Sequence, residues 1–350
     1  MRPIFIVGCP RSGTYLLLKL INSNFDVASP IETHFIPYFR RYLFLYGNLE
    51  KAHNRRKLID SIFEFLAIWN PVMMQSRTIS NFEDQSLLKI KDKVDEIVKN
   101  SNSYNSIIEQ IFYLFAKSKG KDSWADKSAF FECVDLKKIV NLPSNPIVIH
   151  IVRDGRDVAC SWLDTWHGPK NYVSAALRWK QHVETKRAWG EKNPERYLEL
   201  SYEALVTNPE KILFLISQFI NKEPISSKFS SNVNNAFSKT LSRLDSHKLI
   251  NSKVSETRVN RFLKDIPTKT VSEIEGVIAN TLMEFGYKPI NKGSLKGSYI
   301  KVFFSMVRDK FAFNNFYRMV KVNLPVLIWL CSVFGRKIPF RYLVLNKSRK

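Results

Sequence analysis

Continuous hydrophobic runs alternate with helical spacing along most of the chain. Residues 3–7 (PIFIV) and 146–152 (PIVIHIV) are apolar and rich in β-branched residues, which is typical of strands buried in a parallel sheet. Shorter strands are predicted at residues 25–29 and 197–200. Apolar spacing of three and four predicts helices over residues 16–22, 157–163, 172–189, 209–220 and 272–285, the last one ending at Gly286. The alternation predicts an α/β fold with a central parallel sheet flanked by helices.

Two regions depart from this alternation. Residues 40–120 show helical spacing at 58–69, 94–98 and 107–115, which predicts a helical insert. Residues 124–130 carry no such pattern, and we expect a loop there. Residues 1–290 are therefore expected to form one domain that contains the insert. Residues 296–350 are expected to form a C-terminal helical extension.

The net charge of the chain points to an anionic ligand. The 350 residues carry +22, and a hydrophobic fraction of 45% excludes a disordered basic tail. A phosphate-rich cofactor, a nucleic acid or a membrane surface would each fit this charge. Half of the surplus lies in residues 296–350, which contain twelve Lys and Arg residues and a single acid, Asp309.

The cysteines and the N-terminus indicate a cellular compartment. Four cysteines, at positions 9, 133, 160 and 331, match no zinc spacing, and we interpret them as reduced thiols. The first strand begins at residue 3, which leaves no room for a signal peptide or an anchor. We therefore expect a cytoplasmic protein without a metal.

The segment that follows the first strand has the form of a phosphate-binding loop. Gly8 and Gly13 enclose four residues between a strand and a helix, so that backbone N–H groups can surround a phosphate. A nucleotide triphosphatase would have Lys and then Ser or Thr after the second glycine. Thr14 and Tyr15 stand there instead, and the cation, Arg11, lies inside the loop. The loop is therefore not expected to bind Mg-ATP.

This loop resembles that of a known enzyme family. The sequence Pro10-Arg11-Ser12-Gly13-Thr14, followed by Leu16-Leu17, is similar to the 5′-phosphosulfate loop of sulfotransferases. Those enzymes use 3′-phosphoadenosine 5′-phosphosulfate (PAPS) as the donor and release 3′,5′-ADP (PAP). The resemblance implies a three-layer P-loop fold without a catalytic metal. It also implies donor contacts from Pro10, Arg11, Ser12, Gly13, Thr14 and Tyr15.

A second segment resembles the family's 3′-phosphate motif. Residues 149–162 place Arg153 at the end of a buried strand and Ser161 eight residues later, about two helical turns on. A guanidinium and a hydroxyl so placed can converge on one phosphate, and the resemblance assigns both residues to the 3′-phosphate. We interpret Asp154, Arg156 and Asp157 between them as a local set of salt bridges rather than donor ligands.

The resemblance also implies the catalytic groups. Lys127, in the segment Trp124-Ala125-Asp126-Lys127-Ser128, matches the lysine that contacts the transferred sulfuryl group and the leaving phosphate. Glu32 lies 21 residues after Arg11, as the catalytic Glu does in tyrosylprotein sulfotransferases, and is the expected base. His34 is the alternative base, because small-molecule sulfotransferases use a histidine.

The remaining assignments are less specific. Tyr202, in the segment Tyr202-Glu203-Ala204-Leu205, is expected to contact the donor or to serve as a core residue. The resemblance implies that an arginine of this region reaches the 3′-phosphate. Asn260-Arg261-Phe262 stands where many relatives have Gly-x-Trp, so that the arginine could be Arg258 or Arg261. The resemblance covers about residues 1–290.

The acceptor is not encoded in a recognisable motif. A hydroxyl acceptor is expected, and it could belong to a glycan, a lipid, a metabolite or a tyrosyl peptide. The alternatives are a P-loop kinase of nucleotides or small molecules, which the position of Arg11 disfavours, and an acceptor group other than a hydroxyl. No nucleic-acid-binding module is present. Residues 322–335 are uncharged but too short to span a bilayer. The basic, aromatic-rich segment 296–350 either contacts the inner membrane surface or packs on the domain.

Overall fold

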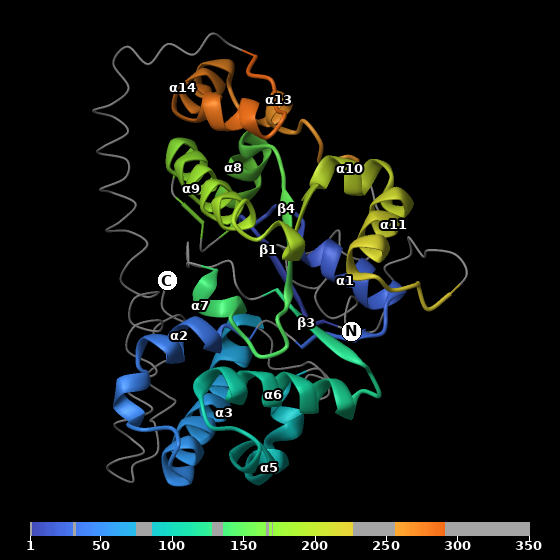
Figure 1. Ribbon diagram of the computed structural model, residues 1–350. Helices are drawn as coiled ribbons and strands as arrows, with labels where there is room; N and C mark the ends of the chain where they lie inside the picture. Colours follow the sequence, from blue (N-terminus) through green and yellow to red (C-terminus); the bar gives the residue numbers. More distant parts are fainter. Residues whose placement is uncertain are drawn as a thin grey trace.

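A five-stranded parallel sheet forms the centre of the computed structural model, which describes residues 2–30, 33–74, 86–127, 136–165, 168–169, 171–226 and 256–290. The strands run in the order β2-β3-β1-β4-β5 (Figure 1). Their bounds are β1 (Ile4–Gly8), β2 (Val27–Ala28), β3 (Ser123–Asp126), β4 (Ile147–Val152) and β5 (Tyr197–Ser201). The α/β fold with a central parallel sheet is confirmed.

The two continuous hydrophobic runs form β1 and β4, which lie side by side within the sheet. Every residue of β1 and β4 is buried, and the two strands pair in parallel from Ile4 opposite Ile147 to Gly8 opposite Ile151. Successive side chains point to opposite faces. Phe5 and Val7 therefore join one hydrophobic cluster, whereas Ile4 and Ile6 join another. Burial on both faces explains why these strands have no polar alternation.

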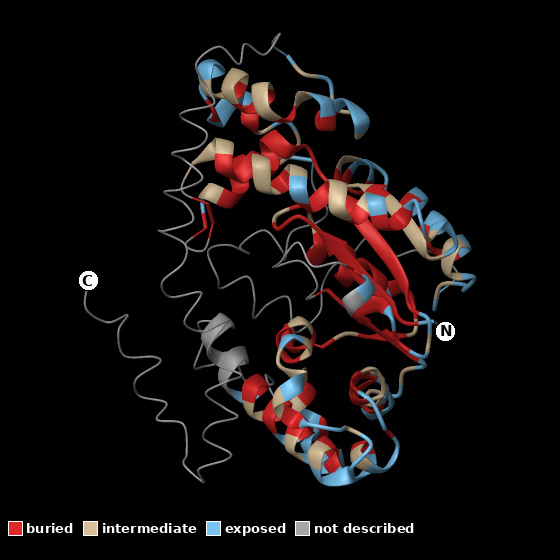
Figure 2. Ribbon diagram, turned by 60° about the vertical axis from the view of Figure 1, so that its left-hand side comes forward, coloured by how far each residue is buried: buried red, intermediate tan, exposed pale blue. Residues whose placement is uncertain are grey.

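Helices cover both faces of the sheet. On the face of Ile4 and Ile6 lie α1 (Thr14–Asn24), α10 (Tyr202–Thr207) and α11 (Pro209–Ile220). A third cluster joins Cys9 and Val152 to α8 (Gly155–Leu163), α9 (Tyr172–Gly190), α13 (Phe262–Asp265) and α14 (Thr268–Glu284). Figure 2 shows the buried sheet between helices whose outer sides are exposed. Cys9 and Cys160 are both buried.

The helical insert packs on the face of Phe5 and Val7. It comprises α2 (Phe35–Arg41), a 3₁₀ turn at Leu43–Tyr46, α3 (Ala52–Met74), a 3₁₀ segment at Leu87–Lys93, α5 (Val94–Lys99) and α6 (Tyr104–Ser118). Its core residues share a cluster with Phe5, Val7 and Trp124. Within the described residues, the range predicted as an insert, 40–120, is largely helical. The short helix α7 (Lys137–Val140) and the 3₁₀ turn Pro194–Arg196 complete the described elements.

One predicted loop is a strand. Residues 123–126 form β3, which pairs with β1 at Ile4–Ala125 and with β2 at Val27–Ser123. The segment SWAD has too few apolar residues for its pattern to show a strand, although all four residues are buried. Its strand character comes from pairing with two neighbours, which sequence spacing does not report.

The C-terminal extension at residues 296–350 lies outside the described residues. Among the helices that are described, none has the length and apolar character needed to cross a bilayer.

Gly155 offers a test of the packing that positions α8. A Cβ at this position would lie 2.6 Å from two ring atoms of Trp179, which is fully buried and donates its Nε1 proton to the Arg153 carbonyl at 2.9 Å. We expect Gly155→Ala to lower the free energy of unfolding by about 1–3 kcal/mol through overpacking, measured by urea denaturation. Gly120→Ala is the comparison, because no atom lies within 4 Å of its Cβ position and only its φ of +63° opposes the change. A Gly155 variant as stable as the wild type would contradict the packing argument.

Candidate functional site

Chemically active residues follow four neighbouring strands directly. The loop Cys9–Gly13 follows β1, Lys127 follows β3, Arg153 follows β4 and Tyr202 follows β5. Because the strands are parallel, these positions share the carboxyl edge of the sheet, where ligands of α/β folds bind. The topology thus brings together residues that are up to about 190 positions apart in the chain.

The loop after β1 has the backbone geometry of an anion-binding nest. Arg11 and Gly13 both adopt positive φ, at 73° and 91°, and the N–H of Ser12 donates to the Cys9 carbonyl at 3.1 Å. Alternation of left-handed residues turns successive N–H groups toward a common centre. The helix that follows, α1, has no side-chain cap and no acid in its first turn, which suits an anion at its N-terminus.

Two features of this loop fit a bound ligand rather than a plain turn. Arg11 holds a left-handed conformation that is costly for a residue with a Cβ, and such outliers cluster at functional sites. The Ser12 side chain is fully buried, yet its Oγ has no hydrogen-bond partner among the described residues. Gly13 is required sterically, because a Cβ there would lie 2.5 Å from Cδ2 of Tyr202.

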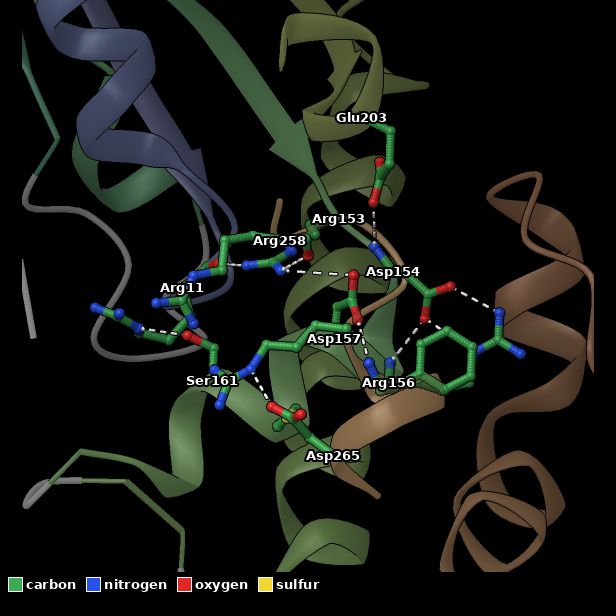
Figure 3. A network of polar contacts seen from close by, with 12 residues as sticks. Arg11, Arg153, Asp154, Arg156, Asp157, Ser161, Glu203, Arg258 and Asp265 are labelled. Carbon is green, nitrogen blue, oxygen red and sulfur yellow. Dashed lines mark hydrogen bonds and ion pairs between the residues drawn. The ribbon is translucent and has the colours of Figure 1, made fainter. Parts of the chain in front are cut away.

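Arg11, Arg153 and Ser161 meet at this loop, as Figure 3 shows. Arg11 donates from Nε to Ser161 Oγ at 3.1 Å, and Arg153 donates from Nη1 to the Arg11 carbonyl at 3.1 Å. Arg153 also stacks over the Tyr202 ring, with Cζ 4.6 Å from the ring centroid. The two motifs read separately from the sequence therefore form one cationic region in space.

Lys127 lies in the same region, with 5% of its surface exposed and its Nζ 5.6 Å from the Tyr15 ring centroid. Burial, and then the positive charge of Arg11, lower its pKa to about 7. Lys19 contacts the same ring at 5.1 Å, and burial lowers its pKa to about 8. The Tyr15 ring therefore lies against two ammonium groups, an arrangement that cation–π attraction stabilises.

The cations of the site repel one another. Burial, followed by the charges of Arg153 and Arg258, lowers the pKa of Arg11 to about 10. An anion bound here would raise the pKa of Lys127 and that of Arg11, because opposite charge favours the protonated state. The residues present therefore fit a ligand with several negative charges.

Residues 256–265, called the closing segment below, carry two arginines that differ in their environment. Arg261 is ion-paired with Asp164, Nη1 to Oδ2 at 2.9 Å, and with Asp265. Arg258 makes no ion pair within the described residues, its carbonyl accepts from Arg153 Nη2 at 2.5 Å, and its charge acts on Arg11. The geometry thus leaves the Arg258 guanidinium, rather than that of Arg261, for an anion.

The segment between Arg153 and Ser161 contains the expected salt bridges. Arg156 pairs with Asp154 at 2.7 Å and with Glu275 of α14 at 2.5 Å. Asp157 accepts from the backbone N–H of Phe262 at 2.9 Å and lies 3.5 Å from Arg153 Nη2.

Some predicted site residues are placed differently or not described. Glu32, the expected base, and Ser128 lie outside the described residues. His34 is buried and precedes α2 with a φ of 52°. Sequence reasoning missed Trp179, whose Nε1 fixes the Arg153 carbonyl. Helical spacing could indicate that Trp179 is buried, but nothing in the sequence indicates its hydrogen-bond partner. In the described parts of the chain, no group of three or more His, Cys, Asp and Glu side chains could hold a metal.

Comparison with known proteins identifies the family to which this site belongs. The model of the sulfotransferase family matches residues 3–223, and the chain therefore belongs to that family. It is a transferase of the sulfotransferase type.

Solved structures support the same fold. The sulfotransferase domain of the Synechococcus PCC 7002 olefin synthase superposes with a TM-score of 0.52 at 20% identity, over 79% of this chain and 94% of that one. The sulfotransferase domain from the curacin biosynthetic pathway gives a TM-score of 0.52 at 16% identity, over 81% and 97%. No curated protein matches the chain.

The lowered pKa of Lys127 predicts pH-dependent anion binding. With a pKa of about 7, Lys127 is about 90% charged at pH 6 and about 3% charged at pH 8.5 before an anion binds. Sulfate, the probe, should therefore raise the melting temperature more at pH 6 than at pH 8.5. The measurement is thermal unfolding with and without sulfate at each pH.

Lys127→Arg is the matched control, because a guanidinium stays charged at both values. This variant should show the same sulfate increment at pH 6 and pH 8.5. A wild-type increment that does not depend on pH would contradict the assignment of Lys127 to the anion site.

Proposed function

We propose that this protein transfers a sulfuryl group from PAPS to a hydroxyl group of an acceptor. The observation that carries the proposal is the meeting of the β1 loop with Arg153 and Ser161 at one edge of the sheet. PAPS carries anionic groups at both its 5′ and 3′ positions, and the site offers cations in two matching groups. Membership of the sulfotransferase family supports the same donor.

The first group would hold the 5′-phosphosulfate. The N–H groups of the loop, the N-terminus of α1, Arg11 and Lys127 supply positive potential around one point. The second group would hold the 3′-phosphate with Arg153, Ser161 and Arg258. Tyr202, whose ring packs against both Gly13 and Arg153, would support the two groups through its ring. Pro10, Ser12, Thr14 and Tyr15 complete the loop.

Catalysis then depends on how these residues stabilise the negative charge that develops in the transition state. The donor supplies the sulfuryl group and leaves as PAP. Lys127 and Arg11 stabilise negative charge on the oxygen that links sulfur to the leaving phosphate, because they are positive, buried and already in place. The net reaction joins the acceptor oxygen to sulfur, breaks the bond between sulfur and that linking oxygen, and releases the acceptor proton.

Glu32 is proposed as the base that takes this proton. Its spacing of 21 residues from Arg11 supports the assignment, and β2 ends at Ala28, next to β3 and thus on the side of Lys127. His34 is the alternative base. The acceptor hydroxyl is proposed only as a class, which includes glycans, lipids, metabolites and tyrosyl peptides.

Binding of PAP tests the assignment of the second group. Arg258→Ala should weaken PAP binding about 10- to 100-fold, because a charge-assisted hydrogen bond contributes about 1.5–3 kcal/mol. Its affinity for 5′-AMP, which lacks the 3′-phosphate, should be nearly unchanged. Isothermal titration calorimetry measures both affinities.

Arg261→Ala is the control for this experiment. Since Arg261 is held by Asp164 and Asp265, its loss should lower the melting temperature more than it weakens PAP binding. A wild-type protein that binds ATP but not PAP would refute the proposed function and favour a kinase. The opposite ranking of the two variants would exchange their roles.

Substitution of the proposed base separates chemistry from donor binding. Glu32→Gln should reduce kcat at least about 100-fold, as expected when a general base is lost, while PAP affinity stays within about twofold. Turnover is measured with labelled PAPS and an acceptor found by screening. The matched variant His34→Gln should retain most of the activity. Retained turnover in Glu32→Gln together with its loss in His34→Gln would transfer the role to His34.

A further inference from the structure

The buried carboxylate of Asp157 connects Arg153 to the segment that carries Arg258. Asp157 is the third residue of α8, and its side chain has no exposed surface. One oxygen, Oδ1, accepts from the backbone N–H of Phe262 at 2.9 Å, and the other, Oδ2, lies 3.5 Å from Arg153 Nη2. Figure 3 shows Asp157 beside Arg153 and Arg258.

The same guanidinium holds two other segments. Arg153 donates from Nη1 to the carbonyl of Arg11 and from Nη2 to the carbonyl of Arg258. Its Nε, although Arg153 is only 4% exposed, has no hydrogen-bond partner among the described residues. Nη1 and Nη2 of Arg153 therefore donate to backbone oxygens of the protein, whereas the buried Nε can donate to a ligand.

The segment 258–262 is fixed at both of its ends by this arrangement. Arg258 is held through its carbonyl by Arg153, and Phe262 is held through its N–H by Asp157. The Phe262 ring also lies 4.1 Å from Cζ of Arg156. The backbone of Arg258 is thereby held beside the guanidinium of Arg153.

Asp157 is not suited to contact a phosphate. It is negatively charged and fully enclosed, and burial raises its pKa, with the nearby carboxylates of Asp154 and Glu203 adding to the rise while Arg153 and the Phe262 N–H oppose it. A buried carboxylate is costly unless its partners compensate its charge. Its partners here are the groups that the proposed function assigns to the 3′-phosphate, and its effect on a ligand must pass through them.

We propose that Asp157 is a positioning residue for recognition of the donor's 3′-phosphate, acting by holding Arg153 and the Arg258 segment in register. This inference rests on the proposed function of the site. It goes beyond the salt-bridge role expected from the sequence, because it links this carboxylate to one phosphate of one ligand.

Asp157→Asn is the decisive variant. The amide oxygen can still accept from the Phe262 N–H, but the charge that orients Arg153 is lost. PAP affinity should fall about tenfold, the scale of one weakened charge-assisted bond, while 5′-AMP affinity should change less than about twofold. Calorimetry with both nucleotides gives the ratio of the two affinities, which a purely structural role would leave unchanged.

Asp265→Asn is the matched control. Asp265 is also an acid that holds the closing segment, through Arg261, but no contact joins it to Arg153 in the described residues. The ratio of PAP to 5′-AMP affinity should stay at the wild-type value in this variant. An unchanged ratio in Asp157→Asn, or an equal loss of both affinities, overturns the proposal.

Two further measurements keep the test conclusive. If Asp157→Asn does not fold, Asp157→Glu retains the charge but displaces it, and the same fall in the ratio is expected. In an Arg153→Ala background, Asp157→Asn should have no further effect on the ratio, because Asp157 acts through Arg153. A wild-type protein with no preference for PAP over 5′-AMP would refute the proposed function itself, and that outcome is distinct from a wild-type preference that Asp157→Asn leaves intact.

Discussion

The guanidinium of Arg153 is the interaction on which the site depends. It lies at the end of β4 and donates to the carbonyl of Arg11 in the loop after β1 and to that of Arg258 in the closing segment. Backbone oxygens hold this cation without cancelling its charge, and the buried carboxylate of Asp157, 3.5 Å from Nη2, adds a single ion pair. One positive side chain therefore connects three segments of the chain.

Several carboxylates near the site pair with two other arginines, Arg156 and Arg261. Asp154 and Glu275 pair with Arg156, and Asp164 and Asp265 pair with Arg261. Each of these acids neutralises an arginine that has a structural role. Burial, and then repulsion from neighbouring arginines, lowers the pKa of Lys127 and that of Arg11.

The sequence predicted the long buried strands better than the short strands and the contacts between side chains. The continuous runs of β1 and β4 identify buried strands because no polar residue interrupts the pattern except His150, and the glycines after them mark the loops. β3 was missed because its four residues carry no repeat long enough to detect, and pairing alone defines it. The motifs located Arg11, Lys127, Arg153 and Ser161. The different environments of Arg258 and Arg261 could not be predicted, since they depend on Asp164 and Asp265, which lie on different helices or at their ends.

The strand order has a consequence for how the chain acquires its site. β1 is made first, yet its partners are Ala125 of β3 and Ile147 of β4, so that the N-terminal strand cannot pair until more than a hundred further residues exist. Arg258 arrives later still. Contacts of such long sequence separation form slowly, and a nascent chain exposes its apolar first strand meanwhile. The contacts at the carboxyl edge of the sheet are therefore completed only after β5 and the segment of Arg258 have been synthesised.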